Sequence, residues 1–424
     1  MLALAPDPSS ARAAQPLASG RSWPVTGAAD GNAVWGECRG SAAAPYRTVV
    51  DLSGPAYRCS CPSRKFPCKH ALALLLMWSD GAVGSSADPP GWAASWVAAR
   101  TAKTSDPEDP KPPADPAAAL RRAEQREARV ATGLAELGRW LCDQVRQGLA
   151  ASQRAGYRHW DEIAARMVDA QAPGLAERLR ALAAVPHSGG GWEGRLLEEY
   201  ALVWLLAAAG TDQARLPAPL RDTVRSRVGF TIRQAEVLAT ATPVRDYWHV
   251  LARRNLDQDR FRTRRTWLRG RDTGRDALVL SFAATGQSLD DSFRVGTDVD
   301  ADLAFYPGAV PLRALVAARR DTFPGFPPSG VPVAGLLAGY AAALGADPWL
   351  DTWPAVLDVT PARPPVPGLY DADGDAVPLH PGAGQAWPLV ALSGGEPLTV
   401  AGEWTPRGLW PLTAWDQDGR VVPL

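Results

Sequence analysis

Residues 57–78 read YRCSCPSRKFPCKHALALLLMW, and the organisation of the N-terminal part of the chain follows from them. They include three of the five cysteines and one of the five histidines of the 424-residue chain. The spacing is C-x-C-x6-C-x-H, and an apolar run begins directly behind it. Thiol and imidazole donors packed this closely have the composition of a closed zinc site. The sequence therefore predicts that Cys59, Cys61, Cys68 and His70 bind one Zn²⁺.

The pattern favours a structural zinc ion over a catalytic one. A catalytic zinc ion keeps one coordination position open and usually has an acidic residue nearby. Here all four positions would be filled, and no Asp or Glu lies between Leu52 and Ser79. The remaining alternative is that the cysteines are buried in pairs beside an incidental histidine, which the ligand spacing disfavours.

The residues before the ligands indicate a small antiparallel sheet. Residues 33–38 (AVWGEC) have an extended pattern, and residues 46–52 alternate between two faces. Residues 56–61 resume the extended pattern after a turn. Because Cys59 and Cys61 are two residues apart, we expect both side chains on one face of this strand.

The apolar run behind the motif predicts a helix over residues 69–78, buried on more than one face. Cys68 and His70 would lie at its first turn. Three thiolates and one Zn²⁺ leave the site with a net charge of −1, which the helix N-terminus and nearby basic side chains would offset. These basic residues, the possible contacts to a partner or to nucleic acid, are Arg58, Arg64, Lys65 and Lys69.

Composition limits the classes of function. Acidic and basic residues are equal in number, so no global field favours nucleic acid or an anionic membrane. Three of the five cysteines are clustered in a motif that suits zinc, which is unlike the cysteine pattern of a secreted, disulfide-bonded protein. We therefore expect a reducing, cytoplasmic environment. No apolar run reaches the length of a membrane span, and no membrane partner is predicted.

The fold class expected is α+β and multidomain: a small zinc-stabilised sheet-plus-helix finger, an α-helical middle region and a β-rich C-terminal region. The predicted segments are an N-terminal segment (1–32), the finger (33–80), a Pro-rich linker (81–115), a helical domain (116–256) and a mixed, β-rich domain (257–424). Asp115 followed by Pro116 predicts the start of a long helix. One or two helices are expected within residues 218–256.

Beyond residue 257 the pattern changes to short apolar runs separated by turn residues. Strands are expected over residues 261–268 and 277–284, and helices over 311–319 and 333–344. From Trp353 onward the sequence predicts a β-rich region, a small barrel or a sandwich.

Other candidate sites carry weaker signals. Cys38 could be a spare ligand or a redox thiol, but a small core residue is favoured. The arginine-rich segment 253–275 could form a phosphate or single-strand-binding face. The solvated face of a hairpin is the favoured interpretation, with Phe261 and Thr263 pointing inward. Nucleotide-binding, nucleophile-elbow and metalloprotease motifs are missing, so no enzyme activity is predicted.

The motif and its lead-in resemble a known family. The core CSCPSRKFPCKHALALLL, preceded by WGEC (35–38), GS (40–41), PY (45–46) and VDL (50–52), is similar to the SWIM-type zinc finger of bacterial proteins over about 45 residues. The resemblance implies binding to DNA or to other proteins. Bacterial members look like components encoded alongside MoxR-type AAA+ ATPases and von Willebrand A-type proteins, which implies a protein partner.

These observations lead to three hypotheses. The first is a non-enzymatic interaction module or scaffold that contacts a protein. The second is a DNA- or RNA-binding protein that uses the basic surface around the finger. The third is an enzyme with its site in the C-terminal region, for which the finger is a targeting module.

Overall fold

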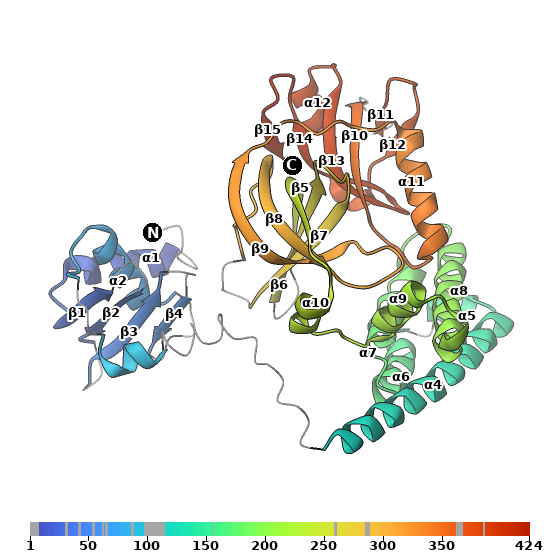
Figure 1. Ribbon diagram of the computed structural model, residues 1–424, viewed down its shortest axis with the longest axis horizontal. Helices are drawn as coiled ribbons and strands as arrows, with labels where there is room; N and C mark the ends of the chain where they lie inside the picture. Colours follow the sequence, from blue (N-terminus) through green and yellow to red (C-terminus); the bar gives the residue numbers. More distant parts are fainter. Residues whose placement is uncertain are drawn as a thin grey trace. The chain divides into compact units, whose positions relative to one another are not determined.

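The computed structural model describes residues 8–29, 33–40, 44–52, 56–61, 63, 67–85, 89–96, 115–154, 156–257, 261–284, 289–361, 368–384 and 386–424. The chain divides into two compact units (Figure 1). The first comprises residues 1–110, 255–264 and 281–291, and the second comprises residues 111–254, 265–280 and 292–424. None of the described helices combines the length and the apolar character needed to cross a membrane.

The first unit is built on a four-stranded antiparallel sheet in the order β1-β2-β3-β4. Its elements are α1 (Pro8–Ala14), η2 (Gln15–Ser19), β1 (Val25–Ala29), β2 (Ala33–Cys38), β3 (Tyr46–Asp51), β4 (Ala56–Cys59) and α2 (Lys69–Ser79). The three strands expected around the ligands are present. The structure adds β1, which the sequence analysis missed because three of its five residues, Gly27, Ala28 and Ala29, are of types depleted in strands.

Helix α2 supplies six of the fourteen buried residues in the core of this unit, more than any other element. It begins after Cys68, whose backbone is extended (φ −73°, ψ 167°) and which caps the helix. Every residue from His70 to Leu75 is buried, and so is Met77. The helix is thus buried on more than one face, as its apolar run predicted.

The second unit begins with a helical bundle. Its helices are α4 (Pro116–Gln147), α5 (Ala150–Arg154), α6 (Gly156–Asp169), α7 (Pro173–Leu182), η3 (Val185–His187), α8 (Trp192–Thr211), η4 (Gln213–Arg215), α9 (Ala218–Val228) and α10 (Gln234–Thr240). The start of α4 is as expected, because the Asp115 carboxylate accepts a hydrogen bond of 3.0 Å from the backbone N–H of Ala118.

The helical region ends earlier than predicted. Strand β5 (Val244–Asp257) occupies residues that the boundary at 256 had placed with the helices. Its centre, from Trp248 to Ala252, is continuously buried and is apolar except for His249. A run of this kind fits a buried strand as well as a helix, so periodicity alone could not assign it.

A closed five-stranded barrel follows, in the order β5-β6-β7-β9-β8 (Figure 1). It is completed by β6 (Phe261–Gly270), β7 (Asp276–Ala284), β8 (Thr297–Phe305) and β9 (Arg313–Pro324). The third and fifth strands of the barrel, β7 and β9, pair in parallel. This order and this parallel pair are the topology of OB-type barrels.

The helix expected over residues 311–319 is wrong, because most of this segment belongs to β9. LRALVAARR is rich in helix-forming residues, so local propensity favours a helix. Strand β9 closes the barrel between β7 and β8, and the ladder partners that it gains there override this preference.

The C-terminal part is an open six-stranded sheet in the order β12-β11-β10-β13-β14-β15. It contains β10 (Trp353–Pro361), β11 (Gly368–Tyr370), β12 (Ala376–Pro378), β13 (Leu398–Thr405), β14 (Gly408–Trp415) and β15 (Val421–Pro423), with α11 (Val333–Ala346), η5 (Pro381–Ala383) and α12 (Trp387–Ser393). The helix expected over 333–344 is confirmed as α11. The barrel lies earlier in the chain than the C-terminal region in which it was expected.

Within the second unit, the bundle and the C-terminal sheet pack with the part of the barrel that belongs to this unit. A shared core joins Leu251 and Trp267 of the barrel to Val356, Leu412 and Trp415 of the sheet. The bundle is attached through Trp349, whose indole N–H donates a hydrogen bond of 2.8 Å to the carbonyl oxygen of Leu202. An ion pair of 2.8 Å between Arg227 and Asp347 adds a second contact.

Candidate metal centre

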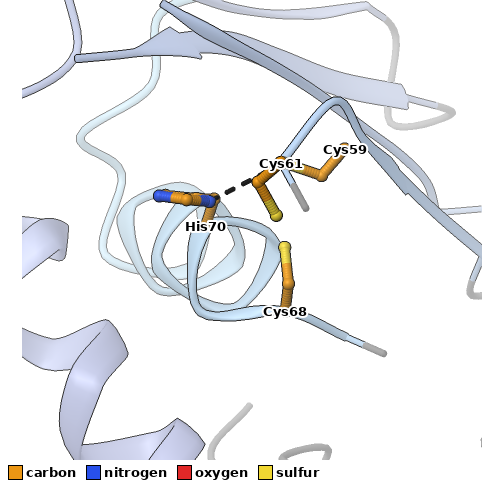
Figure 2. A group of neighbouring side chains, drawn as sticks. All are labelled: Cys59, Cys61, Cys68 and His70. Carbon is orange, nitrogen blue, oxygen red and sulfur yellow. Dashed lines mark hydrogen bonds between the residues drawn. The ribbon is translucent and has the colours of Figure 1, made fainter. Parts of the chain in front are cut away.

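The four predicted ligands come together between the end of β4 and the start of α2 (Figure 2). Cys59 is the last residue of β4, and Cys61 lies just beyond the strand. Cys68 caps α2, and His70 is the second residue of that helix. The predicted strand over residues 56–61 is shorter than expected, because β4 ends at Cys59 and Cys61 lies at a bend, but both thiols still reach the ligand group.

The spacing of the ligand atoms suits a single tetrahedral zinc ion. All four atoms lie within 4.8 Å of one another. The Sγ atom of Cys59 is 3.7 Å from Nδ1 of His70. Zinc bonds of about 2.3 Å to sulfur and about 2.0 Å to nitrogen place tetrahedral neighbours about 3.5 to 3.8 Å apart. The Cys₃His group is therefore able to bind one zinc ion with only small movements.

Two side chains of β3 support the ligands. The hydroxyl of Thr48 is 3.2 Å from Sγ of Cys59, its partner in the β3–β4 ladder. The ring of Tyr46 lies 4.9 Å from the ring of His70. The sequence analysis did not single out either residue. The alternating pattern of β3 places both on one face, but only the strand register shows that this face meets the ligands.

Protons are shared unequally among the three thiols. A hydrogen bond from Cys68 is the main cause that lowers the pKa of Cys59, and His70 and Thr48 add to it. The same bond raises the pKa of Cys68, and burial raises the pKa of Cys61. Zinc binding needs the thiolate form of the cysteines, so zinc affinity is expected to rise with pH.

The fully buried hydroxyl of Thr48 provides a direct test of this support. Replacing Thr48 with Val keeps the side-chain shape but removes the hydrogen bond to Cys59. We expect zinc affinity to fall by about ten-fold or more, as for other residues that orient a metal ligand. Competition with a chromogenic chelator measures the change. Thr26→Val in β1 is the matched control, and equal affinities for the two variants would refute the role of Thr48.

The predicted contact residues have different outcomes. Arg58 and Lys69 are exposed beside the ligands. Arg64 and Lys65 lie outside the described residues. Cys38 is fully buried in the core of the finger and is not part of the ligand group. Burial raises the pKa of its thiol, which suits a core residue better than a reactive one.

The arginine-rich segment 253–275 is engaged in ion pairs within the chain. The pairs are Arg254–Glu403 and Arg265–Glu403 (2.7 Å each), Arg262–Asp257, Arg264–Asp291, Arg269–Asp276 and Arg271–Asp298 (2.8 to 2.9 Å). Arg260 lies outside the described residues. Thr263 points inward as expected, but Phe261 does not, because 42% of its surface is exposed. Carboxylate partners make these arginines poor candidates for phosphate contacts.

A cavity of about 450 Å³ at the barrel contains a histidine–aspartate pair. Nδ1 of His249 lies 2.6 Å from Oδ1 of Asp298, which also accepts a hydrogen bond from Arg271 at its other oxygen. Nε2 of His249 is buried and has no hydrogen-bond partner among the described residues.

Comparisons with known proteins agree with the geometry. Residues 46–79 match the model of the SWIM zinc finger, and residues 125–228 match that of the SWIM-associated four-helix bundle domain. No curated protein and no solved structure matches the chain. The first match covers all four ligands, and the second lies within the helices α4 to α9. The chain therefore contains a SWIM zinc finger, whose Cys₃His group is able to bind one zinc ion, and the four-helix bundle associated with such fingers.

Proposed function

We propose that this protein is a non-enzymatic scaffold whose zinc-stabilised finger contacts a protein partner. The observation that best supports this proposal is the closed ligand group. Cys68 and His70 are buried, and four protein atoms fill the coordination sphere of one tetrahedral ion. Zinc in such a site stabilises a fold and leaves no position for substrate. Its role is to hold the end of β4 and the start of α2 together, with Arg58 and Lys69 on the surface.

Two observations support a protein partner over nucleic acid. The arginine-rich segment 253–275 is engaged by acidic residues of the chain itself. OB-type barrels bind oligonucleotides on the face of their second and third strands. In this barrel, Trp267 of β6 and Leu278 of β7 pack against residues of the C-terminal sheet, so part of that face is covered.

The resemblance to bacterial SWIM proteins supports a MoxR-type AAA+ ATPase system as the source of the partner. A basic surface on the finger would then face an acidic surface on that protein. Electrostatic complementarity of this kind contributes mainly to the association rate and to specificity.

The test uses the double variant Arg58→Glu/Lys69→Glu, which keeps the zinc ligands. We expect unchanged zinc content and binding to the MoxR-type partner that is weaker by roughly ten-fold. Arg21→Glu, at an exposed arginine elsewhere in the same unit, should bind as the wild type does. Titration with duplex and single-stranded DNA and with RNA at several salt concentrations completes the experiment. Tight nucleic-acid binding that falls steeply with salt would favour the second hypothesis.

A further inference from the structure

A cavity of about 650 Å³ lies on the helical bundle, at the N-terminal half of α4. Four arginines line it: Arg122, Arg126 and Arg129 from α4, and Arg225 from α9. Among the described residues that line it, Glu127 is the one acidic side chain. The lining therefore carries an excess of three positive charges, although the chain as a whole has equal numbers of acidic and basic residues.

Two of these arginines are held in place by Phe230. The guanidinium carbons of Arg126 and Arg225 lie 4.3 and 4.2 Å from the centre of its ring. Arg126 also donates a hydrogen bond of 3.1 Å to the carbonyl oxygen of Gly229. Arg225 pairs with Glu127 at 2.7 Å. Because these contacts fix both guanidinium planes, little side-chain entropy remains to be lost when an anion binds.

The positive charges of the other two arginines are not neutralised by a described carboxylate. Arg122 and Arg129 are exposed, and neither forms an ion pair with a described residue. Along α4, Arg122, Arg126 and Arg129 are spaced by about 6 Å and about 4.5 Å. This arrangement contrasts with the barrel, where six arginines of segment 253–275 form ion pairs with carboxylates. The cavity is thus a concave cationic site with two arginines held in place and two exposed arginines that have no described counter-charge.

The ring of Phe230 is covered by the guanidinium groups of Arg126 and Arg225, and this distinguishes between nucleic acid and other anions as ligands of the cavity. Proteins that bind single-stranded nucleic acid offer open aromatic faces on which bases stack. Here the aromatic ring already stacks with two guanidinium groups. The anion already bound in the cluster is a carboxylate, that of Glu127. An anion that needs no open aromatic ring suits the cavity better than a nucleobase does, and carboxylates presented at short intervals along an extended acidic peptide meet this requirement.

We propose that this cavity of the bundle binds an acidic peptide segment of a protein partner. The carboxylates of the segment pair with Arg122 and Arg129, while Arg126 and Arg225 form the cationic floor. The site is separate from the zinc finger. It gives the scaffold a second point of attachment, selected by the charge of the partner.

Fluorescence anisotropy with a labelled poly-glutamate peptide and the full-length, zinc-loaded protein tests this assignment. The wild type should bind the peptide at low ionic strength, and the double variant Arg122→Glu/Arg129→Glu should bind it at least about ten-fold more weakly. Arg139→Glu is the matched control, because Arg139 is exposed on the same helix but does not line the cavity. Its affinity for the peptide should equal that of the wild type.

Three results would overturn the proposal. The first is no peptide binding by the wild type. The second is an equal loss in Arg139→Glu, which would indicate a general effect of charge. The third is displacement of the peptide by oligo(dT) or tripolyphosphate at concentrations at which free poly-glutamate does not displace it. Because the variants leave the finger intact, failure here is distinguishable from failure of the finger to bind its partner.

Discussion

Replacing Cys68 with Ser is expected to abolish zinc binding and to unfold the finger. Zinc binding stabilises small sites of this kind by about 10 to 16 kcal/mol, and that free energy is folding free energy. Cys68 is both a ligand and a buried member of the core that joins α2 to the sheet. Elemental analysis should find one zinc ion per wild-type chain and none in the variant. Hydrogen exchange should show loss of protection over residues 46–79.

The bundle, the barrel and the C-terminal sheet should keep their protection in Cys68→Ser, because their cores contain no residue of the finger. Cys142→Ser is the matched control, since Cys142 lies in α4 and is not part of the ligand group. It should retain one zinc ion. A full zinc complement in Cys68→Ser would show that the ligand set is wrong.

Replacing Glu403 with Gln should strongly destabilise the contact between the barrel and the C-terminal sheet. Glu403 is fully buried in β13. Its carboxylate forms ion pairs of 2.7 Å with Arg254 and Arg265, and accepts a hydrogen bond of 2.9 Å from the indole of Trp267. Glutamine keeps the volume but leaves two guanidinium groups without a counter-charge. We expect the free energy of unfolding to fall by about 3 kcal/mol, because removing one partner leaves the buried charges of the others unpaired.

Hydrogen exchange of β13 and β14 measures this local opening directly. The matched control is Glu396→Gln, an exposed position just before β13, where a change below about 0.5 kcal/mol is expected. Unchanged exchange in Glu403→Gln would mean that the apolar core around Trp267 and Leu412 holds the two parts together without the ion pairs.

Cys68 and Glu403 also show why the zinc site could be predicted from the sequence whereas the role of the arginine-rich segment could not. Cys68 belongs to a local motif, whose four ligands lie within a short stretch of chain. Glu403 lies almost 150 residues from Arg254, so no spacing rule connects the two. Without its acidic partners, the segment 253–275 resembles a nucleic-acid surface. With them, its arginines are part of the packing of the barrel.

The sequence by itself determined the finger: its four ligands, the three strands around them, the buried helix α2 and, through Asp115 and Pro116, the start of α4. All of these depend on contacts between residues that are close in the chain, where propensity, capping and ligand spacing act directly.

Only the tertiary structure decided the barrel. Strand β9 has a helix-like sequence and becomes a strand because β7 and β8 supply its ladder partners. The buried run of β5 fits a strand as well as a helix, and its pairing with β8 in the barrel decides between the two. The partners of the arginines, the support that Thr48 gives to Cys59, and the cationic cavity on α4 and α9 all join distant residues. Burial and pairing between such residues follow from the fold, and local sequence patterns do not encode them.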